Sequence, residues 1–155
     1  MIEINEQFEV PSAPPPFVWS LLSDPHAVVG CVPGAELGAE HEDGSFDGSL
    51  KVKFGPARVT FRARIDLELD QAAMTGRVTS RGKDNQGGTR FRASMSFKVT
   101  DNAEKTGTTV LIQGENEITG KLAGIVEAGA KIVIKRMAAE FSENLAARCA
   151  GANTP

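Results

Sequence analysis

The 155-residue sequence contains no tyrosine, only two histidines and only two cysteines. No phenol group and only two imidazole groups are therefore available for acid–base catalysis. The cysteines, Cys31 and Cys149, form neither a CxxC motif nor the spacing of metal ligands, which predicts two buried or half-buried free thiols and no metal site. His26 and His41 fall in expected loops and are not expected to meet.

Long hydrophobic runs and clusters of positive charge are also missing. No apolar segment approaches the roughly 20 residues that a membrane-spanning helix needs, and the acidic, alternating N-terminus is unlike a signal peptide. We therefore expect a cytoplasmic protein. The formal net charge is −3 and no Lys/Arg run occurs, which argues against nucleic-acid binding. The length fits one domain over residues 1–150, with a frayed tail at 151–155.

A long helix is predicted at the C-terminal end, from Gly120 to Cys149. Small and apolar residues recur there at steps of three and four; they are Leu122, Val126, Gly129, Val133, Met137, Phe141, Leu145 and Cys149. Such a helix would be about 40 Å long and would need a broad surface to cover its apolar stripe. Its first half is rich in Gly and Ala, so either a sheet approaches closely or a hydrophobic gap remains as a ligand site.

Alternating apolar and polar residues predict a series of β-strands before this helix. The expected strands are residues 2–10, 35–42, 46–54, 57–70, 74–80, 91–99 and 110–118, with a glycine-rich break at 82–88. After the first strand, Ser12 could cap a short helix that ends at Asp24-Pro25, and residues 26–30 could form a second short turn. We predict an α+β fold in which a curved, seven-stranded antiparallel sheet grips the long helix.

Several motifs in this order resemble the family of the carbon monoxide dehydrogenase subunit CoxG, within the START-like helix-grip superfamily (SRPBCC). The resemblance covers about residues 2–149. The residues that carry it are Val18-Trp19 with Leu22 and Asp24-Pro25, CVPGAE at 31–36, LKVKFGP at 50–56, Gly82-Lys83-Asp84 with Gly87, and TGKLA at 119–123. The short-helix pattern is common to the superfamily, whereas the combination of CVPGAE, VKFGP and GKLA is much more specific to the CoxG-like group.

The resemblance implies a hydrophobic ligand cavity between sheet and helix. Small residues on the inward side of the strands (Gly48, Ala63, Gly76, Ala93 and Gly114) also favour a hollow over a filled core. The predicted cavity lining is Phe46, Leu50, Val52, Phe61, Ile65, Met74, Val78, Phe91, Met95, Phe97, Ile112, Asn116, Val126, Gly129, Val133 and Met137. The family motif suggests that Cys31, Val32, Pro33 and Gly34 form the pocket mouth.

Three polar residues, Glu6, Ser80 and Asn116, share the inward side of the strands. A hydroxyl or amide group there could hydrogen-bond a ligand carbonyl such as a quinone oxygen, and an isolated Glu6 could act as a base. The alternative is that each residue lies near a strand end and meets water or backbone. No paired acid and base is visible, so no catalytic residue is assigned.

The expected function is a non-catalytic binding protein that carries a hydrophobic small molecule, a quinone or a lipid, without a tightly bound cofactor. The resemblance implies an accessory role with a molybdenum-containing CO dehydrogenase or related hydroxylase. Some relatives are thought to attach to the membrane through a C-terminal extension, so peripheral contact with its inner face is expected only through a tail beyond Pro155.

Two alternatives remain open. One is a polyketide cyclase-like or hydrolase-like enzyme with the same fold, which would need convergent polar groups in the cavity. The other is a ligand-free docking partner that uses the outward charges of the 57–70 strand: Arg58, Arg62, Arg64, Asp66, Glu68 and Asp70.

Overall fold

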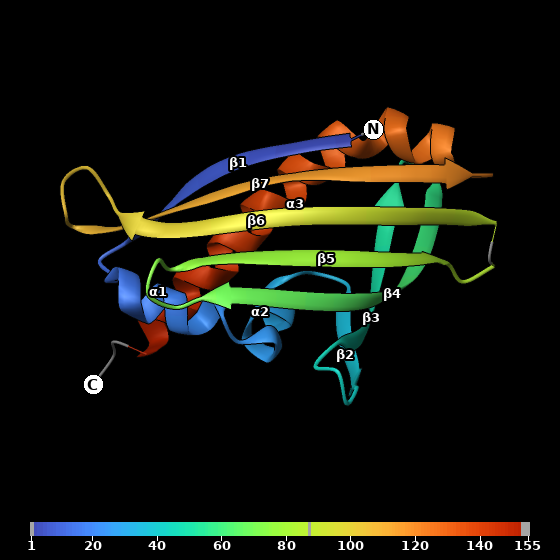
Figure 1. Ribbon diagram of the computed structural model, residues 1–155. Helices are drawn as coiled ribbons and strands as arrows, with labels where there is room; N and C mark the ends of the chain where they lie inside the picture. The colour runs from blue at the N-terminus through green and yellow to red at the C-terminus, as the bar shows by residue number, and fades with distance from the viewer. Residues whose placement is uncertain (1, 87, 153–155) are drawn as a thin grey trace.

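The computed structural model describes residues 2–86 and 88–152, which form seven strands and three helices (Figure 1). The strands are β1 (Ile2–Pro11), β2 (Ala35–Glu40), β3 (Phe46–Phe54), β4 (Ala57–Asp70), β5 (Thr75–Asp84), β6 (Thr89–Asp101) and β7 (Gly107–Gly120). The helices are α1 (Pro15–Leu22), α2 (Pro25–Cys31) and α3 (Ala123–Ala152).

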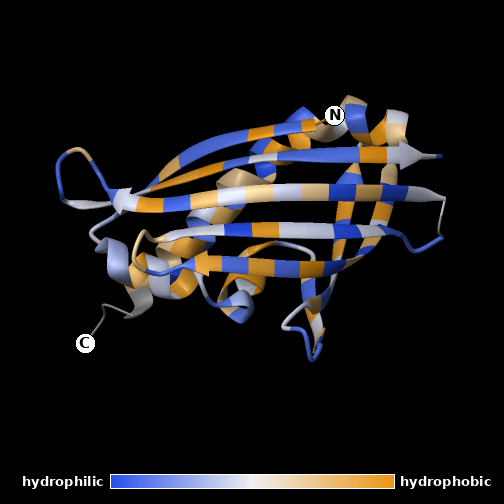
Figure 2. Cartoon of the chain, in the orientation of Figure 1, coloured by the Kyte–Doolittle hydropathy of each residue, from blue (hydrophilic) through white to orange (hydrophobic). Residues whose placement is uncertain are grey.

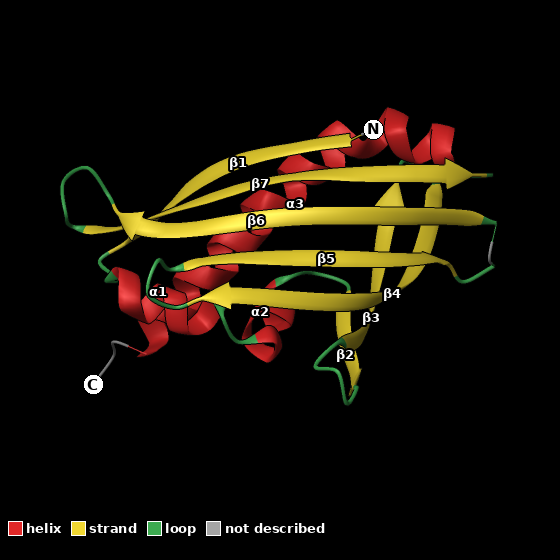
Figure 3. Cartoon of the chain, viewed as in Figure 1, coloured by secondary structure: helices red, strands yellow, loops and turns green. Residues whose placement is uncertain are grey.

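The strands form one antiparallel sheet in the order β1-β7-β6-β5-β4-β3-β2. Consecutive strands are neighbours from β2 to β7, and β1 pairs with β7 at the far edge. The sheet curves so that α3 crosses one of its faces diagonally (Figure 1), and the two short helices lie near the C-terminal end of α3 (Figure 3). The predicted α+β helix-grip architecture is confirmed.

Alternation along the strands follows from the exposure of one face to water and the other to α3 (Figure 2). On α3, the predicted apolar stripe also faces inward: Val126, Val133, Leu145 and Cys149 are buried. Ile125 and Ile132 lie off the stripe and are exposed. None of the described helices is both long enough and apolar enough to cross a membrane.

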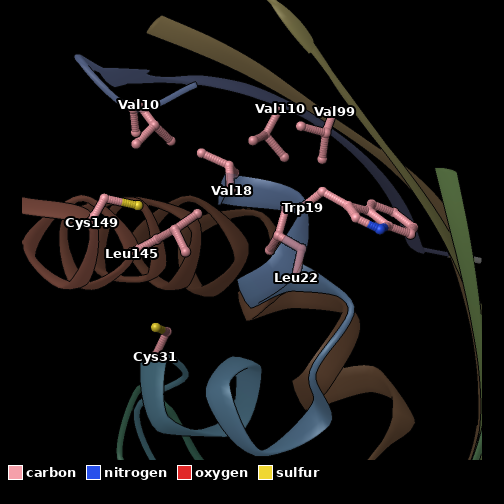
Figure 4. Packing of buried hydrophobic residues seen from close by; sticks show 10 residues of the cluster. Val10, Val18, Trp19, Leu22, Cys31, Val99, Val110, Leu145 and Cys149 are labelled. Carbon is pink, nitrogen blue, oxygen red and sulfur yellow. The ribbon is translucent and has the colours of Figure 1, made fainter. Parts of the chain in front are cut away.

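Two separate hydrophobic clusters hold the sheet and helices together. The α1–α2 core consists of Val10, Ala13, Val18, Trp19, Leu22, Cys31, Val99, Val110, Leu145 and Cys149; most of these are shown in Figure 4. The β3–β4 core consists of Val52, Phe54, Val59, Phe61, Ile118, Val126 and Val133. Because α3 contributes to both clusters, it joins the two ends of the curved sheet.

The predicted cap of the first helix is wrong. Ser12 has a positive φ of 64° and donates its backbone N–H to Thr106 O at 3.0 Å, so it forms the turn that leaves β1. The N-cap of α1 is Pro14, which provides no side-chain cap. Asp24, expected only to end the first helix, caps α2 by accepting the N–H of His26 at 3.0 Å.

The long helix begins at Ala123 rather than at Gly120 and continues to Ala152, into the segment expected to be a frayed tail; residues 153–155 lie outside the described part. Gly120 ends β7 with a φ of 110°, a conformation that glycine adopts without strain. The glycine-rich break is also shorter than predicted, because β5 continues through Gly82 to Asp84. Gly87 of the motif is outside the described residues.

Candidate functional site

The middle of the concave face is the part of the molecule that α3 covers least closely. The principal strand contacts of α3 are with β1, β7 and β3, on the two sides of the sheet. Within residues 2–86 and 88–152, the central strand β5 is not among these principal contacts. The helix therefore bridges the curved sheet rather than lying on its middle strands.

The strand register aligns two rows of inward residues across this middle region. The first row is Phe46, Ile65, Ser80, Ala93, Asn116 and Ile2, and the second is Leu67, Val78, Met95, Gly114 and Ile4. We call these eleven residues the central band. All of them are half-buried, whereas pairs at the two ends of the sheet, such as Val52–Val59 and Val99–Val110, are buried. The concave surface is thus accessible between the two cores.

The residues predicted to line the cavity lie in three parts of the structure. Phe46, Ile65, Val78, Met95 and Asn116 lie in the central band. The residues in or against the β3–β4 core are Leu50, Val52, Phe61, Phe91, Val126, Val133 and Met137. Met74, Phe97 and Ile112 pack against the α1–α2 core, and Gly129 lies against Phe54. Their contact with a ligand remains a prediction.

Small residues on the inward side of the strands are one reason for expecting a hollow interior, but two of these glycines leave no empty space. A Cβ at Gly48 would lie 2.6 Å from Cδ1 of Ile65, and a Cβ at Gly76 would meet the ring of Phe97. The space above each glycine is therefore filled by the side chain of a neighbouring strand. At Gly129, the sheet approaches the helix so closely that an added Cβ would lie 3.3 Å from Phe54 Cδ1.

The central band includes residues that the sequence-based lining omits. These additional residues alternate in phase with the predicted lining; they are Ile2, Ile4, Leu67 and Ala93. Only the strand register shows that Ile2 and Ala93 lie on the row of Asn116, and that Ile4 and Leu67 lie on the adjacent row. The other inward polar residue, Glu6, pairs with Ile112, outside the band. The polar side chains of the band are therefore Ser80 and Asn116, on the same row on either side of Ala93.

Asn116 has an unusual environment. Its Oδ1 atom is buried, and no hydrogen-bond donor among the described residues reaches it. The residues paired with it, Ile2 on β1 and Ala93 on β6, carry only hydrocarbon side chains. Buried polar atoms in native proteins nearly always have a partner, so Asn116 Oδ1 is an exception among the described residues.

The predicted pocket mouth is held between α3 and β3. Asn144 Nδ2 donates to Cys31 O at 3.0 Å, and Lys51 N donates to Gly34 O at 3.0 Å. The Cys31 side chain belongs to the α1–α2 core, so Val32, Pro33 and Gly34 form the accessible part of the turn. In the preceding helix, the His26 ring packs edge-on against Phe46 at 6.4 Å, which places α2 beside one end of the central band.

Two groups of titratable residues lie away from the band. Burial, with a smaller effect of Cys31, raises the pKa of the Cys149 thiol, and both cysteines are free. At the β2–β3 hairpin, the hydrogen bond from His41 lowers the pKa of Asp47. Arg64 lies 3.5 Å from Asp47, so this member of the proposed docking face is already engaged within the chain.

Grooves are found at the edge of the central band and away from it. One of about 410 Å³ lies between β1 and α3, lined by Ile2, Glu3, Glu127, Ala130, Lys131 and Ile134. The other, of about 510 Å³, lies along β4–β7 and includes Phe97 of the predicted lining. Among residues 2–86 and 88–152, no three His, Cys, Asp or Glu side chains are grouped as metal ligands.

The chain resembles solved structures over nearly its whole length. A conserved protein from Geobacillus kaustophilus has 20% identity and a TM-score of 0.81, with 97% of this chain and 96% of that chain covered. The Zhui aromatase/cyclase from Streptomyces sp. R1128 has 17% identity and a TM-score of 0.62, with 96% of this chain and 93% of that chain covered. A START superfamily protein from Mycobacterium smegmatis has 16% identity and a TM-score of 0.59, with 97% of this chain and 99% of that chain covered. At these identities the likeness establishes a shared fold.

No curated protein matches the chain. The family model for the carbon monoxide dehydrogenase subunit CoxG, however, matches residues 7–150. This match spans every helix and strand, from within β1 to near the end of α3, and it agrees with the motifs in the 31–36, 50–56 and 119–123 segments. The chain therefore belongs to the CoxG family of carbon monoxide dehydrogenase subunits and has a START-like fold.

Proposed function

We propose that this chain binds a flat hydrophobic small molecule against the central band, under α3. The observation that carries the proposal is that all eleven inward residues of the band are half-buried between two packed cores. Apolar surface at the centre of a fold is normally covered because its burial is favourable, at about 25 cal/mol per Å². A ligand would cover the band and gain that free energy.

The chemistry of the band favours an aromatic or polyprenyl ligand with few polar groups, and a quinone is our candidate. Ligand sites of this kind combine hydrophobic walls with a small number of polar anchors. Phe46, Ile65 and Val78 provide rigid walls, and Met95 provides adaptable surface. Ser80 and Asn116 provide the polar atoms on the same face.

We assign the chain an accessory role with a CO dehydrogenase-type redox enzyme, to which it would deliver a quinone and from which it would receive the quinol formed when CO oxidation supplies two electrons. Family membership supports this assignment. The polar side chains of the band, a hydroxyl and an amide, do not form the acid–base pair that a cyclase or hydrolase would need, which favours carriage over catalysis.

Ligand binding can be tested on protein purified from its own host by native mass spectrometry, followed by organic extraction. We expect a near-stoichiometric quinone or other lipid. Titration with 2,3-dimethyl-1,4-naphthoquinone should then quench the fluorescence of Trp19, the sole tryptophan, whose ring is 5.8 Å from that of Phe97. A protein that is purified empty and takes up neither this quinone nor an apolar dye would refute the proposal.

The accessory role needs a separate measurement with the purified enzyme. Quinone supplied on this chain should be reduced faster by a CO dehydrogenase-type enzyme than the same total concentration of free quinone. A variant that does not bind quinone should give only the free-quinone rate. Equal rates with loaded chain and free quinone would contradict delivery while leaving ligand binding intact.

A further inference from the structure

The face of the sheet that is turned away from α3 carries a dense group of positive charges. The strands β4, β5 and β6 each have two basic residues two positions apart, and this spacing places both side chains on the same face. The strand register aligns the three pairs into two rows, which we call the basic array: Arg64, Arg81 and Arg92 in one row, and Arg62, Lys83 and Arg90 in the next. The sequence contains no run of basic residues, so only the folded sheet brings them together.

The charges of the array point to solvent and are largely unpaired. Phe61 and Phe91, which alternate with array residues, belong to or pack against the β3–β4 core, so the basic side chains lie on the opposite face. Arg64 is half-buried and lies 3.5 Å from Asp47. The other five are exposed, and none of them forms an ion pair within residues 2–86 and 88–152.

This arrangement is electrostatically unfavourable in the free chain. Like charges directly opposite each other on neighbouring strands destabilise a sheet. The array contains four such pairs: Arg64–Arg81, Arg81–Arg92, Arg62–Lys83 and Lys83–Arg90. Their backbones are about 5 Å apart, less than the screening length of about 8 Å at physiological ionic strength. The chain as a whole has a formal net charge of −3, so the array does not follow from a basic composition, and a negatively charged partner would relieve the repulsion.

The charges around the array indicate which kind of partner fits it. Four exposed carboxylates border the array on the same face; they are Asp47, Asp66, Glu115 and Glu117. Asp47 and Glu117 lie at the two ends of the row of three arginines, and the other two lie one row away. A surface on which both signs have fixed places matches a folded protein, because charge complementarity between two proteins also fixes their relative orientation.

Two other polyanions fit this surface less well. A lipid surface or a nucleic-acid backbone is negative throughout, so it would also contact the four bordering carboxylates. Among the described residues, no outward side chain of β4, β5 or β6 is aromatic, so a base has no ring on which to stack. The exposed large hydrophobic residues lie outside the array and cannot anchor it in a bilayer; they are Leu69, Ile125 and Ile132.

We propose that the basic array is the docking surface for an acidic patch on the redox enzyme that this chain serves. This inference rests on the proposed accessory role, because that role supplies the partner protein. The array and the central band lie on opposite faces of the sheet. Docking through the array therefore leaves the concave side uncovered, so that ligand can enter and leave while the two proteins are in contact.

The test measures binding of the full chain to the CO dehydrogenase-type enzyme purified from the same host, by biolayer interferometry at low and high salt. Arg81→Glu/Lys83→Glu reverses the two charges at the centre of the array. We expect this variant to bind at least about tenfold more weakly than wild type at low salt, and with a smaller dependence on salt.

The matched control is Arg77→Glu/Lys98→Glu. It also reverses one arginine and one lysine, at exposed positions on the outer face of β5 and β6 but outside the array. The change in net charge is the same in both double variants, so a difference between them reports the position of the charges. The control should bind the enzyme within about threefold of wild type.

Thermal unfolding provides a second readout that does not need the enzyme. Arg81→Glu/Lys83→Glu turns all four like-charge pairs of the array into opposite-charge pairs, whereas Arg77→Glu in the control faces Glu68. The array variant should therefore unfold about 2–6 °C above the control at low salt, and high salt should reduce the difference. Equal midpoints at low salt would show that the array is not under repulsion, and would overturn the inference.

The outcomes separate this inference from the role on which it rests. Equal binding of both double variants to the enzyme would show that the array is not the docking surface, while the accessory role stands. Array-dependent binding to phosphatidylglycerol vesicles or duplex DNA, without binding to the enzyme, would show that the partner is wrongly assigned. Failure of wild type to bind the enzyme, the vesicles or the DNA would refute the accessory role and the inference together. Affinity for 2,3-dimethyl-1,4-naphthoquinone, which should be the same in all three proteins, reports ligand binding independently.

Discussion

At the scale of single residues, Cys149 shows how burial changes side-chain chemistry. The thiol is almost completely enclosed in the α1–α2 core, with 2% of the residue exposed. Burial disfavours the charged thiolate, and the neighbouring Cys31 adds a smaller effect in the same direction, so the pKa of Cys149 is raised. The enclosed thiol is therefore a structural residue and a poor nucleophile near neutral pH.

This raised pKa predicts how stability depends on pH. Above the ordinary thiol pKa of 9.0, the unfolded chain loses a proton that the folded chain retains, so the free energy of unfolding falls as pH rises. Urea unfolding between about pH 7 and pH 10 should show a steeper decline for wild type than for Cys149→Ala. Parallel curves for the two proteins would contradict the assignment.

The glycines show which parts of the site the sequence could not predict. Gly48 and Gly76 lie on the inward face as expected, but the conclusion that they leave a gap is wrong. Whether Ile65 and Phe97 cover them depends on side-chain rotamers and on cross-strand register, neither of which alternation determines. In contrast, Asn116 can be identified from its inward phase alone, and the structure adds that its oxygen is unpaired.

At the scale of elements, the start of α3 is fixed by a chain of hydrogen bonds from the β5–β6 hairpin. Asp84 accepts the backbone N–H of Thr89 at 2.9 Å, and Thr89 Oγ1 accepts the N–H of Leu122 at 2.8 Å. Lys121 N also donates to Gly88 O at 2.9 Å. Backbone donors at the beginning of the helix, which lack partners within it, thus bind the sheet.

Replacing Thr89 should loosen this junction. Thr89→Val keeps the shape of the side chain but removes the oxygen that binds Leu122 N–H, so we expect a loss of about 1–2 kcal/mol in the free energy of unfolding. Amide exchange at Leu122 should accelerate as well. The control is Thr119→Val on β7, where the threonine is exposed; an equal loss in both variants would contradict a specific role for Thr89.

Most strands and the helix stripe could be predicted because burial on one face leaves a direct periodic pattern in the sequence. The errors lie at the ends of elements. The prediction that Ser12 caps α1 fails because the backbone of Ser12 is engaged by Thr106 O at 3.0 Å, a long-range contact. The helix begins only at Ala123 because Lys121 and Leu122 donate their backbone N–H groups to the β5–β6 hairpin. Local helix propensity does not encode this contact.

At the scale of the whole molecule, the fold is a curved sheet whose two ends are joined by one helix. The α1–α2 core fills one end and the β3–β4 core fills the other, and the central band between them remains accessible. In such an arrangement the cores supply the stability of the free protein. A ligand in the band would then bring the two ends together through a shared surface, and would stabilise the folded state by mass action.

A hollow centre and a filled centre predict opposite results when a large side chain is added. Ala93→Phe places a ring in the central band, where space is open on our interpretation, so the free energy of unfolding should change by less than about 1 kcal/mol. The same ring should weaken binding of 2,3-dimethyl-1,4-naphthoquinone by at least about tenfold, because it occupies the proposed site.

The matched control adds the same ring to a filled region. Val99→Phe lies on the same strand, but Val99 is 1% exposed within the α1–α2 core, so overpacking should lower the free energy of unfolding by about 1–3 kcal/mol. Urea unfolding with comparison of midpoints and slopes measures both variants. If Ala93→Phe is as destabilising as Val99→Phe, side chains already fill the centre, and the chain would be a docking partner rather than a carrier.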